Sequence, residues 1–144
     1  MSDAQYMQRA LQLAQLGIGK VSPNPMVGCV IVNRDRIIGE GYHQHYGGPH
    51  AEVNAITDVV DKEILKEATV YVTLEPCLMC FGACIHARID RLIFATEDQK
   101  SGAVINNLNL QEESFFNHKI SVSSGILGTE SSELLKKFFQ ERRN

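Results

Sequence analysis

Four residues in two short segments have the types and spacing of a metal-binding site. His50 and Glu52 lie in one segment, and Cys77 and Cys80 lie in the other, directly after Pro76. Cys77 and Cys80 are three residues apart, so on the first turn of a helix both sulfurs point the same way. The partial positive charge at a helix start favours thiolate, the form that binds metal. One imidazole and two thiolates suit Zn²⁺ and leave a fourth tetrahedral position for solvent. We therefore predict one zinc ion per chain, held by His50, Cys77 and Cys80, with a water or hydroxide in the open position.

Glu52 is the candidate catalytic residue. It lies two positions after His50, too close to share the ion comfortably but able to reach bound solvent. There it would take a proton as zinc lowers the pKa of water towards ~7, and would deliver protons to a ring nitrogen and a departing amine. Attack of the hydroxide on the amine-bearing carbon would give a tetrahedral intermediate, and the backbone at Ala51 and at the Cys77 turn would hydrogen-bond it. The pairing of H-x-E with P-C-x-x-C resembles the zinc nucleobase deaminases, which implies that Glu52 is an acid/base and not a ligand.

Other interpretations of these residues stay open. An unrelated buried histidine and a helix that happens to carry C-x-x-C would have no catalytic role. A thioredoxin-like redox pair is a second reading, although it would not need the H-x-E segment. A protein whose zinc only holds the fold together is a third. Cys29 lies in an apolar run, and Cys84 follows three ligands that already suffice, so both are predicted to be core residues.

Helices and strands must bring the two segments together. Apolar residues at helical spacing predict a first helix that Asp3 caps and that Gly17 and Gly19 end. Expected strands cover residues 27–32, 37–42, 69–74, 91–95 and 119–123; the other expected helices cover 50–60, 77–87 and a last stretch capped by Thr129, with Leu134, Leu135, Phe138 and Phe139 on one apolar face. Residues 98–118 show no sustained period, which indicates a lid or a binding segment. This order predicts a single α/β domain over residues 1–144, a three-layer α/β/α sandwich with a five-stranded mixed sheet.

The overall composition narrows the class of protein. The chain has 144 residues, of which 44% are hydrophobic and 22% charged, and a net charge of −3. These values exclude wholesale disorder, and no apolar run reaches the ~18 residues that a membrane span needs. The amino-terminal segment lacks the pattern of a signal peptide, so we expect a cytoplasmic protein with no membrane partner. Neither half is basic, so strong non-specific nucleic-acid binding is not indicated, although a local RNA contact stays open.

The two halves of the chain resemble different deaminases. Residues 5–56 resemble the pyrimidine deaminase domain of riboflavin biosynthesis, in which the positions of Asn24 and His43 line the substrate pocket. Residues 69–143 resemble the bacterial tRNA-specific adenosine deaminases, which convert the wobble adenosine to inosine. The chain departs from the riboflavin family between its two zinc cysteines, where two apolar residues replace a longer polar loop that contacts substrate. Both resemblances imply a cytidine-deaminase-like fold.

These resemblances imply a small heterocyclic substrate, first the riboflavin-pathway diaminohydroxyphosphoribosylaminopyrimidine. Lys100 would supply a cation for its phosphate, and Asn24, His43 and the Ala51 backbone are the other predicted substrate contacts. A tRNA adenosine is the alternative, and a guanine- or cytosine-type base is a further one. A tRNA partner would need several cations at the pocket mouth; the candidates are Arg88, Lys100, Lys119, Lys136, Lys137, Arg142 and Arg143. Relatives are commonly dimers or larger, so we expect a homodimer or higher homo-oligomer, with residues 87–94 and the preceding helix as its interface.

Overall fold

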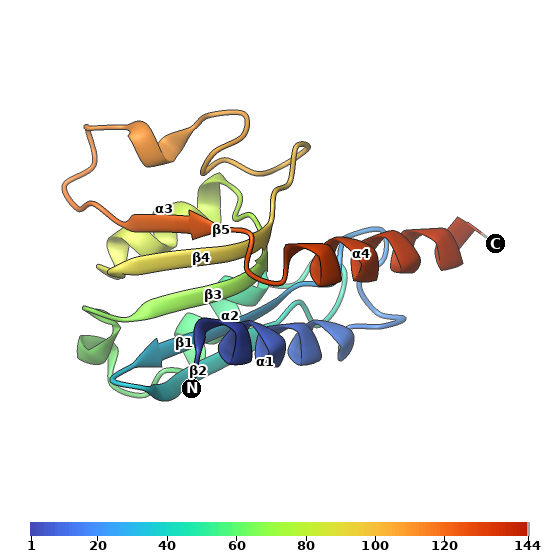
Figure 1. The fold of residues 1–144 in the computed structure, drawn as a ribbon, viewed down its shortest axis with the longest axis horizontal. Coiled ribbons are helices and arrows are strands. Elements are labelled where there is room, and N and C mark those ends of the chain that lie inside the picture. Colours follow the sequence, from blue (N-terminus) through green and yellow to red (C-terminus); the bar gives the residue numbers. More distant parts are fainter. Residues whose placement is uncertain (144) are drawn as a thin grey trace.

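Five strands form one mixed sheet in the order β2-β1-β3-β4-β5 (Figure 1). The computed structural model describes the backbone of residues 1–143 and the side chains of residues 1–141. The strands are β1 (Gly28–Asn33), β2 (Arg36–Tyr42), β3 (Thr69–Leu74), β4 (Arg91–Thr96) and β5 (Ser121–Ser124). β1 is antiparallel to both β2 and β3, whereas β3, β4 and β5 run parallel. The predicted hairpin and the predicted parallel crossovers are both confirmed.

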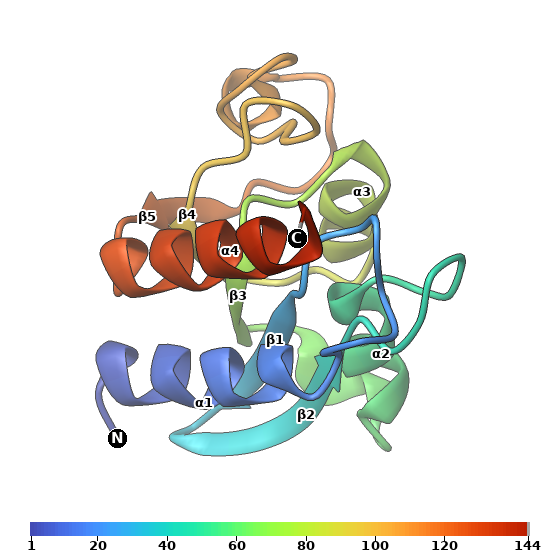
Figure 2. The same ribbon diagram turned by 90° about the vertical axis from the view of Figure 1, so that its right-hand side faces the viewer.

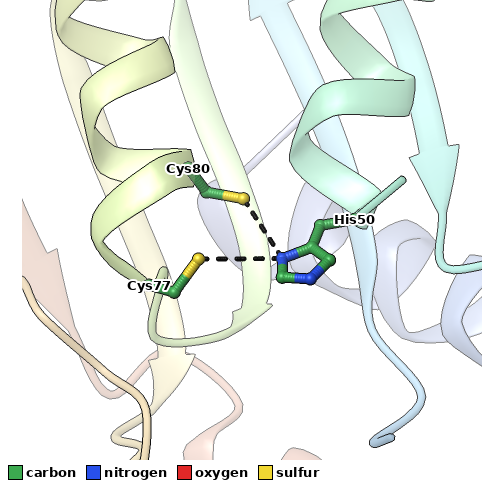
Figure 3. Close-up of side chains that lie close together, drawn as sticks. All are labelled: His50, Cys77 and Cys80. Atoms are coloured by element: carbon green, nitrogen blue, oxygen red, sulfur yellow. Dashed lines mark hydrogen bonds between the residues drawn. The ribbon is translucent and has the colours of Figure 1, made fainter. Parts of the chain in front are cut away.

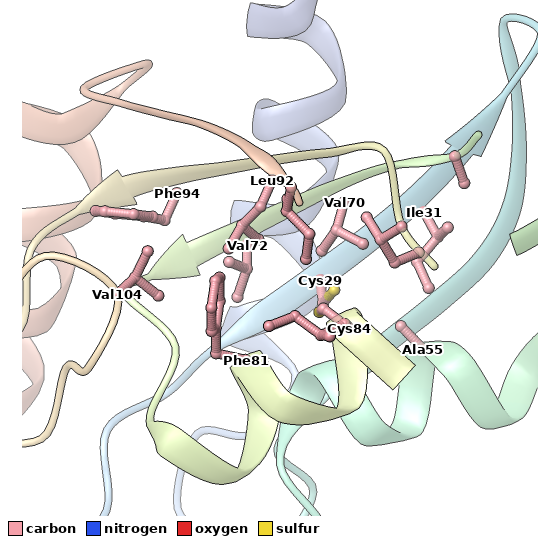
Figure 4. Packing of buried hydrophobic residues seen from close by; sticks show 14 of the residues in the cluster. Cys29, Ile31, Ala55, Val70, Val72, Phe81, Cys84, Leu92, Phe94 and Val104 are labelled. Atoms are coloured by element: carbon pink, nitrogen blue, oxygen red, sulfur yellow. The ribbon is translucent and has the colours of Figure 1, made fainter. Parts of the chain in front are cut away.

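Four helices cover the two faces of this sheet and complete a three-layer sandwich (Figures 1 and 2). They are α1 (Asp3–Gln15), α2 (Ala51–Asp58), α3 (Leu78–His86) and α4 (Gly128–Arg143). α1 and α4 lie on one face, and α2 and α3 lie on the other (Figure 2). In the larger core, Ala55 of α2 and Phe81 of α3 pack with Val70 and Val72 of β3 (Figure 4). The predicted fold class and element order are confirmed.

The first helix begins at Asp3, one residue earlier than predicted. Ser2, not Asp3, is the N-cap of α1, and its hydroxyl accepts a hydrogen bond from the Gln5 backbone N–H at 3.2 Å. The Gln5 side-chain oxygen accepts in return from the Ser2 backbone N–H at 2.8 Å, which completes a capping box. The Asp3 carboxylate instead accepts from the Tyr71 hydroxyl and pairs with Arg91, so it ties α1 to the sheet.

The predicted interface stretch is mostly interior. Ile89, Leu92 and Phe94 are each 0% exposed and belong to the core between the sheet and α3. The suggestion that residues 87–94 form a subunit interface is therefore wrong for these side chains. Strands β3 and β4 are parallel neighbours inside the sheet, which is why an apolar run here is buried within one chain.

Helix α2 rests directly on the backbone of β2. A Cβ atom on Gly41 of β2 would lie 2.5 Å from the Ala51 carbonyl oxygen, and nearer still to the Ala55 backbone nitrogen. Only glycine leaves room for this approach of helix to strand. The contact fixes the height of α2 above the sheet, and with it the start of the helix where His50 and Glu52 lie.

The segment between β4 and β5 is largely irregular. Among the described residues, this segment holds one short 3₁₀ helix, η2 (Leu110–Glu112). Another 3₁₀ helix, η1 (Lys62–Leu65), lies elsewhere in the chain, between α2 and β3. β5 begins two residues later than expected, and α2 ends at Asp58, two residues before Val60. Within residues 1–143, no helix has the length and apolar character to cross a membrane.

Candidate functional site

The predicted metal ligands lie at the starts of two neighbouring helices. His50 is the N-cap of α2, and Cys77 is the N-cap of α3, which follows β3 through Pro76. Neither N-cap side chain makes a capping hydrogen bond, so the imidazole and the thiol face each other instead. Cys80 lies in the first turn of α3 and turns its sulfur to the same point (Figure 3). The helix starts thus bring the three residues together.

The separations of the three donor atoms suit one tetrahedral ion. His50 Nδ1 lies 3.7 Å from Cys77 Sγ and 3.5 Å from Cys80 Sγ (Figure 3). All three donor atoms lie within 4.8 Å of one another. A nitrogen ~2.0 Å and a sulfur ~2.3 Å from one tetrahedral zinc are about 3.5 Å apart. The donor set and its spacing are therefore compatible with zinc.

The two sulfurs share a proton unequally. The hydrogen bond from Cys80 lowers the pKa of Cys77 to about 5, and the nearby His50 ring contributes in the same direction. The same hydrogen bond raises the pKa of Cys80, and burial adds to this effect. One sulfur is thus a thiolate at neutral pH even before a metal ion removes the second proton, which is the state that a helix start was expected to favour.

The other two cysteines are core residues. Cys29 of β1 and Cys84 of α3 are each 0% exposed and pack in the core beneath α3 (Figure 4). Burial raises the pKa of both thiols, so both stay neutral. Neither belongs to the group of potential metal ligands that the structure brings together. The sequence interpretation of both residues is confirmed.

Glu52 is a buried carboxyl group beside these ligands. It lies in the first turn of α2 and is 4% exposed. Burial raises its pKa to about 7, and the negative charge of Cys77 adds to the shift. A group with a pKa near neutrality can both accept and return a proton under physiological conditions. This is the property that an acid/base residue needs.

A cleft of about 1030 Å³ opens above the ligands. Its walls contain every other residue of the predicted site, while Cys80 is buried behind it. These residues are Asn24, His43, His50, Ala51, Glu52, Cys77 and Lys100. The turn at residues 23–25 forms one wall, and residues 96–101 form another. A cleft of this size accommodates a nucleotide-sized ligand.

Asn24 and His43 act as a pair inside the cleft. His43 is 3% exposed, and its Nδ1 lies 3.0 Å from the Pro49 carbonyl oxygen, which can only accept a hydrogen bond. In the neutral ring Nδ1 therefore donates, and Nε2 accepts from Asn24 Nδ2 at 3.2 Å. This arrangement leaves the Asn24 side-chain oxygen and the second N–H of its amide available to a ligand. His43 thus orients Asn24 and holds the turn before His50.

Sequence reasoning missed part of the cleft. One side of α4 contributes a wall whose residues are Ser132, Leu135, Lys136 and Phe139. Phe138 packs instead in the core between α1 and α4, so the prediction of one continuous apolar face on this helix is wrong. Glu75 also lines the cleft, although it was not singled out. Its place directly before Pro76 and the zinc cysteines was the available signal.

Comparisons with known proteins agree with this geometry. Residues 1–96 match the cytidine and deoxycytidylate deaminase zinc-binding region. The chain is 42% identical to the riboflavin biosynthesis protein RibD of Escherichia coli; the alignment covers 99% of this chain but 39% of RibD. It is 37% identical to the diaminohydroxyphosphoribosylamino-pyrimidine deaminase of Buchnera aphidicola from Acyrthosiphon pisum, covering 99% of this chain and 97% of that protein.

A relative from the other deaminase class matches almost as well. The tRNA-specific adenosine deaminase of Haemophilus influenzae is 39% identical over 98% of this chain and 85% of its own length. Among solved structures, the bifunctional deaminase and reductase of Thermotoga maritima superposes with a TM-score of 0.81 at 38% identity, over 96% of this chain and 40% of its own. From the match at the zinc-binding region and these relatives, we conclude that the chain belongs to the cytidine and deoxycytidylate deaminase family of zinc-dependent deaminases.

Proposed function

We propose that this chain is a hydrolytic deaminase that acts on a diaminohydroxyphosphoribosylaminopyrimidine, replacing an exocyclic amine with a carbonyl and releasing ammonia. The observation that carries this proposal is the placement of a buried carboxyl group, Glu52, beside a His/Cys/Cys donor set at the floor of a nucleotide-sized cleft. The similarity to a pyrimidine deaminase of matching length supports the choice of substrate.

The residues at the floor of the cleft have separate roles in the proposed reaction: three would bind the metal ion and Glu52 transfers protons. His50, Cys77 and Cys80 would hold one zinc ion, which would supply Lewis acidity and lower the pKa of the attacking water. Glu52 takes one proton from the attacking water and passes it to the ring nitrogen. It then takes the remaining proton of the added hydroxyl and delivers it to the departing amine, so that the hydroxyl becomes the carbonyl and ammonia leaves. The backbone N–H groups at Ala51 and the Cys77 turn stabilise the negative charge that develops on the attacking oxygen.

The walls of the cleft bind the rest of the substrate. The Asn24 side-chain oxygen accepts a hydrogen bond from an amine of the pyrimidine, in the orientation that His43 imposes. Lys100 lies on another wall, among residues 97–101, and binds the phosphate of the ribosyl group. A small substrate with a single phosphate needs only one cation at a fixed place, whereas a tRNA needs several.

A tRNA adenosine is the second candidate substrate. The 39% identity to a tRNA-specific adenosine deaminase favours it, as does the cation that α4 places at the cleft, Lys136. The side chains of Arg142 and Arg143, which were predicted to help bind RNA, lie outside the described residues. A tRNA complex would show a steep loss of affinity with salt, because several phosphate contacts release counterions.

One assay separates these candidates. Ammonia release is measured side by side on the phosphorylated aminopyrimidine, on an anticodon stem-loop, and on guanine and cytosine, each at two salt concentrations. The proposal expects turnover of the aminopyrimidine with weak salt dependence. Turnover of the stem-loop alone would replace it with the tRNA function. No turnover of any compound by protein with full zinc occupancy would indicate that the zinc only stabilises the fold.

We also propose a cytoplasmic homodimer or higher oligomer. The apolar side chains of Leu78 and Met79 at the start of α3 are each 56% exposed, and they support a contact through this helix. Light scattering coupled to size exclusion tests the assembly. Leu78→Glu is expected to give a monomer if the contact forms there, whereas an unchanged mass would place the interface elsewhere.

A further inference from the structure

Glu75 is a buried carboxylate with an unusually complete set of hydrogen bonds. It lies between the end of β3 and Pro76 and is 3% exposed. Its Oε2 accepts from the backbone N–H groups of Ile105 at 2.9 Å and Asn106 at 3.0 Å. Its Oε1 accepts from the backbone N–H of Asp98 at 3.1 Å and from Asn106 Nδ2 at 2.6 Å. All four donors belong to the segment of residues 97–106, which we call the β4 wall loop.

The β4 wall loop is joined to the metal-binding turn at further points. The Glu75 backbone N–H donates to the Thr96 carbonyl at 2.9 Å, and the Ala103 N–H donates to the Pro76 carbonyl at 3.0 Å. Pro76 directly precedes Cys77. The loop that forms a wall of the cleft and the turn that begins the floor are therefore one hydrogen-bonded unit.

The network leads from Glu75 to the residues that face the cleft. Asp98, whose N–H binds Glu75, accepts in turn from the backbone N–H groups of Lys100 at 3.0 Å and Ser101 at 3.2 Å through its own carboxylate. These bonds fix the backbone that carries the Lys100 side chain at the cleft. Gly102 closes the loop against Glu75, since a Cβ atom there would lie 2.6 Å from Glu75 Oε1.

Only an ionised carboxylate matches this arrangement. Four N–H groups point at its two oxygens, so each oxygen must accept two hydrogen bonds and neither can donate. A glutamine at this position would turn an NH₂ group towards two of the donors. Two part-buried N–H groups would then lose their acceptor, which costs folding free energy.

We propose that Glu75 is a positioning residue for substrate binding, which holds the β4 wall loop as a preformed wall and thereby places Lys100 relative to the metal ligands. This proposal rests on the proposed deaminase function. For residues 97–106 it favours a fixed wall over the expected lid, because the Glu75 carboxylate accepts four hydrogen bonds from this loop.

Two substitutions approach the carboxylate from opposite sides. Glu75→Gln replaces one of the two acceptor oxygens with an NH₂ group, and Gly102→Ala pushes a methyl group against the side chain from the loop. We expect each variant to raise KM for the phosphorylated aminopyrimidine about tenfold and to change kcat less than about threefold, since the loss affects binding of the part held by the wall. Zinc content should stay at the wild-type value. A parallel fall of kcat and zinc content would overturn the proposal, because Glu75 would then act on the metal turn.

Hydrogen exchange supplies a readout that does not need activity. In the ligand-free wild type, the amides of Asp98, Ile105 and Asn106 should be protected, and in both variants they should exchange at least about tenfold faster. Matched controls are Glu112→Gln, at an exposed carboxylate outside the cleft, and Gly82→Ala, where a Cβ atom has nothing within 4 Å. Unprotected amides in the wild type, or unchanged exchange in both variants, would overturn the proposal. If the wild type exchanges as expected but does not deaminate any compound, the proposed function fails while the role of Glu75 in the loop stands.

Discussion

Replacing Glu52 with glutamine removes the acid/base group and leaves its shape in place. Each proton transfer by a well-placed side chain contributes roughly 10²–10⁴-fold to a rate, and Glu52 is assigned more than one. We therefore expect Glu52→Gln to reduce kcat at least about 10⁴-fold. Zinc content should not change, because Glu52 is not one of the three donors. Ammonia release and elemental analysis measure the two quantities on the same sample.

The same substitution has an effect on stability that the structure allows to be calculated. In the metal-free protein burial raises the pKa of Glu52 from 4.5 to about 7. At about 1.36 kcal/mol per unit, ionising this buried group costs about 3 kcal/mol of folding free energy. The folded state binds the proton more tightly than the unfolded state, so wild-type stability is full below about pH 4.5 and falls as the pH rises through about 7. Glutamine does not titrate and escapes this loss.

Urea unfolding of both metal-free proteins tests the calculation. Relative to the wild type, Glu52→Gln should gain about 3 kcal/mol in free energy of unfolding between pH 4.5 and pH 8. Cys77 titrates in both proteins, so its contribution largely cancels in the difference. A stability difference that is the same at both pH values would refute the burial argument. A variant that still turns over within about tenfold of the wild type would refute the assigned role.

Three further substitutions test other parts of the structure. Cys77→Ser should lower zinc content well below the wild-type value and abolish deamination, as prolonged treatment with a chelator should; full zinc content would show that His50 and Cys80 suffice. Gly41→Ala should destabilise the fold by at least about 1–3 kcal/mol, because its methyl group meets helix backbone that cannot rotate away; thermal unfolding measures this. Lys100→Ala should raise KM about tenfold for the phosphorylated substrate and less than about twofold for its dephosphorylated form. Equal effects on the two substrates would contradict a phosphate contact.

Local patterns made much of this structure predictable. The order of helices and strands follows from apolar periodicity and turn residues. The grouping of the predicted metal ligands follows from their spacing on helix starts that lie within a few residues of a strand or turn. Both signals depend on residues close in the sequence. The cap of α1 was also readable, because Ser2 and Gln5 have the spacing of a capping box that Asp3 lacks.

Long-range features were not predictable in the same way. Glu75 and its four donors are separated by 23 to 31 residues, and nothing in the types of those residues marks them as partners. The wall supplied by α4 depends on what the helix packs against: Phe138 enters the core with Ala14, whereas Phe139 lines the cleft. The order of the strands in the sheet also depends on long-range contacts, because β1 pairs with β3 although β2 and α2 lie between them in the sequence.

The contact of α2 with bare strand backbone at Gly41 has a consequence for how substrate range can change in such enzymes. Because backbone packs on backbone at this contact, no side chain between helix and strand can adjust to a shift of α2. A change that moves His50 and Glu52 would therefore also break this contact and destabilise the fold. The turn at 23–25, the tip at 99–101 and the exposed side of α4 carry side chains that can be exchanged one at a time. A change of substrate would thus come from substitutions in these three segments, while the positions of His50 and Glu52 stay the same. Two relatives with different substrates in their names, at 37% and 39% identity to one chain, are what such a history would leave behind.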